Sequence, residues 1–345
     1  VTPTPTCHPP SAEKSQEMIT LSAAFATSMA TPEHVEIAED LGYERAWLYD
    51  SPALYPDVWA TLARAAERTE RIGLGPAVLV PSLRHPIVNA AAIATLEALA
   101  PGRVAVALGA GFTGRFVLGQ KPMRWIDVAD YVRTLQALLR GDEATWEGAP
   151  IRMLHPDGFG AARPIEVPIL IGADGPKGLA VAAELADGVF SAGQPVAGEG
   201  PTWRALLAFG TVLGPGESPS DERVRDAAGH GLAVVYHAMY ERGGAASVDQ
   251  LPGGAAWRAD VEAAAPERRH LLTHENHLIS VTARDQAALD AGGAELLTSI
   301  TFSGSVDQLR HKVADLEAAG VTELAYQPAG NDIPEELTRM RDALV

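Results

Sequence analysis

Short apolar runs alternate with helical segments from residue 18 onward. We expect strands at 19–27, 45–50, 71–80, 103–111, 167–174, 188–193, 204–213 and 322–327. The helices expected between and after these strands span 31–42, 57–70, 87–100, 125–140, 177–185, 305–319 and 334–344. Strands that are apolar almost throughout and that alternate with helices indicate a parallel sheet covered by helices on both faces.

Two parallel-sheet folds fit this order, an open dinucleotide-binding sheet and an eight-stranded barrel. The open sheet needs a G-x-G-x-x-G turn after its first strand, and the first strand here continues as SAAFATSMATPE, which has none. Polar or glycine residues instead follow several strands, at Asp50, at 109–111 and at 174–175. Barrel enzymes gather their functional residues at the carboxyl ends of many strands. The sequence therefore predicts an α/β fold, a (β/α)8 TIM barrel.

More than a hundred residues separate the seventh and eighth expected strands, which is far longer than one crossover needs. Helical patterns recur within this stretch, at 221–242, 255–265 and 285–291. We expect a mostly helical excursion over 214–298 that folds over the barrel mouth as a lid or forms a dimer surface. Residues 1–17, VTPTPTCHPPSAEKSQE, are expected to form a disordered leader before the barrel of residues 18–345.

The net charge and the cysteine content limit the kinds of molecule that the protein can bind and the cellular compartment in which we expect it. The chain has 27 basic and 44 acidic residues, a net charge of −17, which disfavours binding to nucleic acid or to an anionic membrane surface. Cys7 is the single cysteine, so an intrachain disulfide and a multi-cysteine metal site are excluded. No run of about 20 apolar residues is present to span a membrane. We expect a cytoplasmic protein that acts on small molecules.

Three long segments of the sequence resemble one known family. They are 47–111 (from WLYDSPALYP to VALGAG), 163–193 (RPIEVPILIGADGPKGLAVAAELADGVFSAG) and 305–330 (SVDQLRHKVADLEAAGVTELAYQPAG). In their order and spacing they are similar to the luciferase-like monooxygenase superfamily, and within it to the methylenetetrahydromethanopterin reductase-like enzymes. The resemblance implies a barrel that holds a flavin or deazaflavin at its mouth, and a homodimer formed through the second and third helices.

The resemblance leaves three functions open. The first is hydride transfer between coenzyme F420 and a small organic substrate, which the similarity to the reductases favours. The second is a monooxygenase reaction with FMN and oxygen in the same pocket. The third is a non-catalytic relative that has lost its cofactor. The family-implied cofactor residues are Asp50, Ala77, Val78, Gly109, Ala110, Gly111, Ala173, Asp174, Gly175, Pro176 and Lys177.

Each of these residues has an implied role. A non-prolyl cis peptide is expected between Ala77 and Val78, in the motif GPAVLVP, behind the tricyclic ring. The glycines at 109–111 allow close approach of the backbone to a planar cofactor. The turn at 173–177 is expected to hold the cofactor phosphate on a helix N-terminus, although Asp174 would repel it unless turned away. Asp50 is expected to contact the ring, or else it only caps the following turn.

The expected substrate pocket is apolar. Some F420-dependent relatives have a carboxylate after the last glycine of the fourth strand, where this sequence has Phe112. This difference argues against sugar-phosphate chemistry and for an uncharged substrate. The predicted pocket residues are Phe25, Trp47, Phe112 and His277.

Histidines are concentrated in the excursion, in YHAMYE and RHLLTHENHL. If the second segment is helical, His270, His274 and His277 share one face. Metal ligation, acid–base chemistry and plain packing all fit such a pattern. The H-E-x-x-H pattern is missing and the family needs no metal, so we expect no metal and predict catalytic roles for Asp50, His237 and His274.

Overall fold

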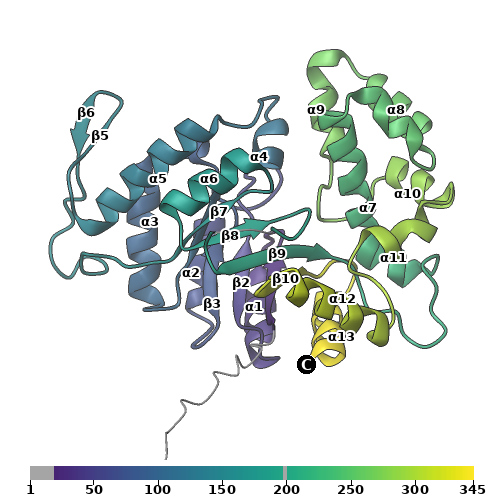
Figure 1. Cartoon of the computed structure of the whole chain (residues 1–345), viewed down its shortest axis with the longest axis horizontal. Helices are drawn as coiled ribbons and strands as arrows, with labels where there is room; N and C mark the ends of the chain where they lie inside the picture. Colours follow the sequence, from purple (N-terminus) through teal and green to yellow (C-terminus); the bar gives the residue numbers. More distant parts are fainter. Residues whose placement is uncertain (1–18, 197–199) are drawn as a thin grey trace, which may run out of the picture.

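Eight parallel strands form the centre of the computed structural model, which describes residues 19–196 and 200–345 (Figure 1). Their order in the sheet is β3-β2-β1-β10-β9-β8-β7-β4. The bounds are β1 (Thr20–Phe25), β2 (Arg45–Leu48), β3 (Gly73–Pro76), β4 (Val106–Gly109), β7 (Ile169–Gly172), β8 (Gly188–Ser191), β9 (Trp203–Phe209) and β10 (Glu323–Gln327). Bridges from Leu74 to Val104 and from Leu79 to Leu108 join the two outer strands. The sheet is therefore a nearly closed barrel, which confirms the predicted fold.

Helices cover the outside of the barrel. They are α1 (Thr31–Asp40), α2 (Val58–Ala66), α3 (Pro86–Leu99), α5 (Trp125–Arg140), α6 (Pro176–Leu185), α12 (Val306–Ala318) and α13 (Ile333–Leu344). Two shorter elements are α4 (Phe112–Phe116) and the 3-10 turn η1 (Pro81–Leu83). Helices α2 and α3, the expected dimer contact, pack against each other; the dimer itself stays a prediction. Among the described residues, no helix has the length and apolar character that crossing a membrane requires.

A small hairpin, β5 (Ala144–Trp146) and β6 (Ala149–Ile151), projects from the barrel after α5. It was not expected from the sequence. Its two-residue turn is Glu147-Gly148, and both residues have positive φ, 51° and 81°. A turn with φ positive at both central residues matches the twist of a hairpin, but a glutamate at the first position is not a usual signal for it.

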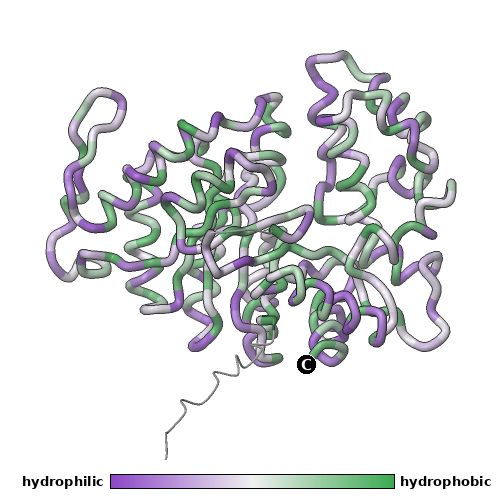
Figure 2. The backbone as a smooth tube through the Cα atoms, in the orientation of Figure 1, coloured by the Kyte–Doolittle hydropathy of each residue, from purple (hydrophilic) through white to green (hydrophobic). Residues whose placement is uncertain are grey.

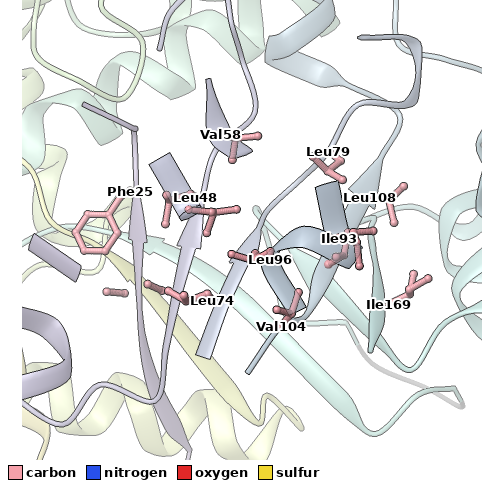
Figure 3. Packing of buried hydrophobic residues seen from close by; sticks show 14 of the residues in the cluster. Phe25, Leu48, Val58, Leu74, Leu79, Ile93, Leu96, Val104, Leu108 and Ile169 are labelled. Carbon is pink, nitrogen blue, oxygen red and sulfur yellow. The ribbon is translucent and has the colours of Figure 1, made fainter. Parts of the chain in front are cut away.

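Two apolar layers hold the barrel. The first lies between the strands and the helices, where Leu48, Leu74, Ile93 and Ile169 pack together (Figure 3). The second fills the barrel interior and contains Trp47. Hydrophobic residues run along the central strands, whereas many outer turns are hydrophilic (Figure 2). This pattern is what a parallel sheet buried on both faces requires.

The excursion forms a separate lobe between β9 and α12 (Figure 1). It contains η2 (Ala245–Gln250), η3 (Pro266–Arg268), η4 (Gly293–Leu296), α7 (Glu222–Arg242), α8 (Gly254–Glu262), α9 (Arg269–Thr273), α10 (Ala283–Asp290) and α11 (Leu297–Ile300). The lobe has its own core, in which Tyr236 and Trp257 are buried. The excursion is thus mostly helical, as predicted. The expected leader, 1–17, lies outside the described residues.

Candidate active site at the barrel mouth

A non-prolyl cis peptide joins Ala77 to Val78 at the carboxyl end of β3, which confirms the prediction from the resemblance. The Val78 side chain lies against the ends of β4 and β7, where both neighbouring positions are glycine. A Cβ atom added at Gly109 would be 2.9 Å from Val78 Cγ2, and one added at Gly172 would be 2.5 Å from Val78 Cγ1. Glycine on two adjacent strands therefore makes the space that this valine occupies.

The turn before α6 has the features of an anion site. Its N-cap is Gly175, where an added Cβ would meet no atom within 4 Å, and no described side chain caps the helix. The N–H groups of the first helical turn have no acceptor within the helix. Lys177 is exposed beside them. The turn fits an anionic group such as a phosphate.

Asp174 does not point its charge into this turn. Its Oδ1 accepts a hydrogen bond from the backbone N–H of Ala192, 3.1 Å away, after β8. The carboxylate therefore links the ends of two adjacent strands. This contact directs Oδ1 of Asp174 toward the end of β8.

Asp50 is held by an ion pair at the end of β2. Both of its oxygens accept from Arg84 Nη1, at 2.8 and 2.6 Å, and its side chain is only 1% exposed. The other nitrogen of Arg84 binds Asp57 at 2.8 Å. Burial raises the pKa of the Asp50 carboxyl, although the hydrogen bonds and charge of Arg84 act in the opposite direction. Contact of Asp50 with a cofactor ring stays a prediction.

The chain turns sharply after β4. Gly111 has a φ of 81°, and a Cβ there would be 2.5 Å from Val80 Cγ1, so only glycine fits. The short helix α4 follows at once and brings Thr113 toward the excursion. Phe112, on the same helix, lies under the guanidinium of Arg242, 4.0 Å from the ring centre. The contact of Phe112 with Arg242 therefore joins the barrel to the lobe.

Three histidines of the excursion meet beside α4. Nδ1 of His237, on α7, lies 2.7 Å from Nδ1 of His277, and Nε2 of His277 lies 3.0 Å from Thr113 Oγ1. His274 packs against both rings, with ring centres 5.4 Å apart. Burial lowers the pKa of His237 and His277 well below the ordinary histidine value, so both rings are neutral near pH 7.

The histidines do not share a helical face. Helix α9 ends at Thr273, and the segment 274–280 is a turn in which Asn276 and Leu278 have positive φ. This turn, not a 3.6-residue period, brings His274 beside His277. His270 lies on α9 and is not part of the cluster.

The turn at 274–280 is attached to the barrel mouth. The Tyr55 hydroxyl, from the loop after β2, donates to the carbonyl of His277. Gln327, at the end of β10, donates to the carbonyl of Leu278 over 2.7 Å and accepts from the Tyr49 hydroxyl. Tyr49, Tyr55 and Gln327 were not among the site residues predicted from the sequence. The signal available for Tyr49 and Gln327 was their position at the carboxyl ends of predicted strands.

Two predicted pocket residues lie elsewhere. Phe25 packs in the layer between strands and helices, as Figure 3 shows. Trp47 is fully buried in the barrel interior, and its Nε1–H donates to Glu323 Oε1 over 2.7 Å. Glu323 begins β10, at the end of the barrel opposite the mouth. The structure therefore brings Phe112 and His277 near each other through α4, but not Phe25 or Trp47.

Comparison with known proteins identifies related chains. The model of the luciferase-like monooxygenase family matches residues 10–323. A 5,10-methylenetetrahydromethanopterin reductase of Archaeoglobus fulgidus is 29% identical over 317 residues, which cover 87% of this chain and 90% of the relative. An F420-dependent glucose-6-phosphate dehydrogenase of Nakamurella multipartita is 36% identical over 152 residues, covering 41% of this chain and 43% of the relative.

A solved structure has the same fold. The coenzyme F420-dependent tetrahydromethanopterin reductase of Methanopyrus kandleri superposes with a TM-score of 0.63 at 18% identity. The superposition covers 95% of this chain and 98% of the reductase. At 18% identity, this similarity shows that the two proteins share a fold.

Proposed function

Because the chain belongs to the luciferase-like monooxygenase family, we propose that it is an oxidoreductase that transfers hydride between coenzyme F420 and a small organic substrate. Two similar proteins support F420 as the cofactor, since the N. multipartita dehydrogenase and the M. kandleri reductase are both F420-dependent. The A. fulgidus reductase, which is similar along nearly its whole length, supports a reductase type of reaction.

The observation that carries the proposal is the open turn before α6. The uncapped helix N-terminus, the free space at Gly175 and the exposed Lys177 together suit the phosphate of a large anionic cofactor. Oδ1 of Asp174 is held by the Ala192 N–H, on the side of β8. We assign Ala173, Gly175, Pro176 and Lys177 to phosphate binding.

The ring of the cofactor is proposed to lie against the carboxyl ends of β3 and β4. Val78 and Ala77 would support one side of the ring, and Gly109, Ala110 and Gly111 would let the backbone approach it. A bound deazaflavin supplies the carbon centre that accepts or donates hydride, while the chain supplies position and electrostatics. Asp50, His237 and His274 stay the candidates for moving a proton at the substrate.

The test compares two cofactors and one substitution. Purified chain is titrated with F420 and separately with FMN, and binding is followed by cofactor fluorescence. Lys177→Ala should weaken F420 binding about 10- to 100-fold, because it removes a charge-assisted contact with a phosphate. Stability should change little, because a lysine at a helix N-terminus is unfavourable to the helix dipole. Lys121→Ala, at another exposed lysine, is the matched control and should bind normally.

The outcomes separate the alternatives. Binding of FMN but not F420 would replace the proposal by an FMN-dependent monooxygenase. Binding of neither cofactor would favour a non-catalytic relative. Equal F420 affinity in the parent and in Lys177→Ala would show that Lys177 does not bind the phosphate, while F420 would still be the cofactor.

A further inference from the structure

Three buried histidines in the excursion point their ring nitrogens toward one small volume. One ligand atom from each of His237, His274 and His277 lies within 4.8 Å of the other two. All three side chains are at most 3% exposed. The convergence joins α7 to the turn at 274–280, so it comes from the tertiary fold and not from a local sequence pattern.

One ring of this cluster, that of His274, has no hydrogen-bond partner among the described residues. Both of its ring nitrogens are buried. A neutral imidazole has one donor and one acceptor, and leaving a buried polar group unpaired is destabilising. Nδ1 of His237 and Nδ1 of His277 lie 2.7 Å apart, a hydrogen-bond distance that one shared proton satisfies. Two nitrogens bound to a tetrahedral zinc ion are about 3.3 Å apart, so the two rings would separate by about 0.6 Å to hold the ion.

We propose that His237, His274 and His277 bind one divalent transition metal ion, with zinc the best match. Three imidazoles are a donor set that zinc accepts, in a four-coordinate geometry that leaves one position for another ligand. A carboxylate lies close to the cluster, since Glu241 Oε1 is 3.5 Å from His274 Nε2. Glu241 or a water molecule would complete the coordination.

The surroundings suit a bound cation. When His277 binds the ion through Nδ1, its Nε2–H is free to donate to Thr113 Oγ1, 3.0 Å away. Such an outer contact fixes the orientation of a ligating histidine. The nearby Arg284 is neutralised by ion pairs with Asp260 and Glu275.

The ion would fasten the lobe at the barrel mouth. It would tie α7 to the turn at 274–280, and that turn is already bound to the barrel through Tyr55 and Gln327. A histidine nitrogen bound to metal has no free lone pair to accept a proton. The metal site would therefore exclude His237 and His274 as proton acceptors through those nitrogens and leave Asp50 as the predicted catalytic residue. The inference does not depend on the identity of the cofactor.

The experiment uses the full chain, treated with chelator and then titrated with Zn²⁺ and, separately, with Co²⁺. We expect one ion per chain, visible absorption bands typical of four-coordinate cobalt, and a higher thermal unfolding temperature with zinc. His274→Ala and His237→Ala should weaken binding by at least about 10-fold, as expected for loss of one of three protein ligands. His230→Ala is the matched control, because His230 is also buried on α7 with both nitrogens unpaired but lies outside the cluster.

Two results would overturn the site. One is a parent chain that takes up no stoichiometric Co²⁺ or Zn²⁺. The other is an ion bound as tightly by folded His274→Ala as by His230→Ala, since it would then lie elsewhere. If the alanine variants do not fold, His274→Gln replaces them, and binding of cobalt as tight as in the parent chain contradicts the proposal. The visible spectrum of the parent chain with cobalt is the second readout, and a spectrum of six-coordinate, solvated cobalt also contradicts the proposal.

Discussion

Replacing Gly172 by alanine tests whether Val78 is wedged at the barrel mouth by the glycines around it. The new Cβ would be 2.5 Å from Val78 Cγ1, about 1 Å closer than carbon atoms pack. Val78 is β-branched and cannot swing away freely. Overpacking of this kind lowers the free energy of unfolding by about 1–3 kcal/mol. Alanine is intrinsically more favourable than glycine in a strand, which offsets roughly 0.5–1 kcal/mol of this loss. We expect a net loss of about 0.5–2 kcal/mol.

The assay is a double-mutant cycle in urea unfolding. With Val78→Ala added, the closest atoms to the new methyl group are at 3.5 Å, an ordinary contact, so most of the loss should be recovered as coupling. Gly160→Ala is the matched control, since its Cβ would meet nothing closer than 3.7 Å. Two results would refute the tight packing of Val78 against Gly172. One is a loss of unfolding free energy below about 0.5 kcal/mol in Gly172→Ala, and the other is a double variant in which the two effects simply add.

Two further predictions concern stability away from the mouth. Trp203→Phe should cost about 1.5–3 kcal/mol in urea unfolding, because it removes the indole N–H, 2.6 Å from the buried Glu323 carboxylate; a cost near zero would show that this contact is not needed. Hydrogen bonds from Arg223 lower the pKa of Glu217 to about 2, so its stabilisation is present above the unfolded value of 4.5 and is lost as pH falls toward 2. Glu217→Gln should flatten this part of the stability–pH curve between pH 5 and 3, and an unchanged slope would contradict the assignment.

The apolar runs predicted the strands because parallel strands are buried on both faces and carry a strong apolar signal. The choice of a barrel over an open sheet depended on the missing G-x-G-x-x-G turn and on the polar or glycine residues that follow several strands. Seven of the eight strands lie within the predicted ranges, for example β7 (Ile169–Gly172) within 167–174, and β9 begins one residue before its range, at Trp203. The cis peptide at Ala77–Val78 was predicted from the family resemblance alone, since its local sequence is that of an ordinary buried strand. The hairpin β5–β6 was missed because two strands of three residues are too short to show alternation.

The site was only partly predictable, for a physical reason. The residues of the turn at 173–177 were named from the family resemblance, with a Gly-Pro pair before a helix as the local signal, and their role stays a prediction. The histidine cluster depends on Asn276 and Leu278 adopting positive φ, which bends 274–280 back toward α7. A helical reading of RHLLTHENHL correctly selected His274 and His277 but also included His270, which the end of α9 separates from them.

The division between barrel and lobe suggests where specificity is set. The proposed cofactor residues follow β2, β3, β4 and β7, which are strands of the barrel. The lobe has a separate core around Trp257 and is joined to the mouth mainly by the turn at 274–280. Changes within that turn should therefore alter the space beside the cofactor without disturbing the barrel. By the same reasoning, an ion on the three histidines would act on substrate access through the position of the lobe, and not on the binding of the cofactor phosphate near Lys177.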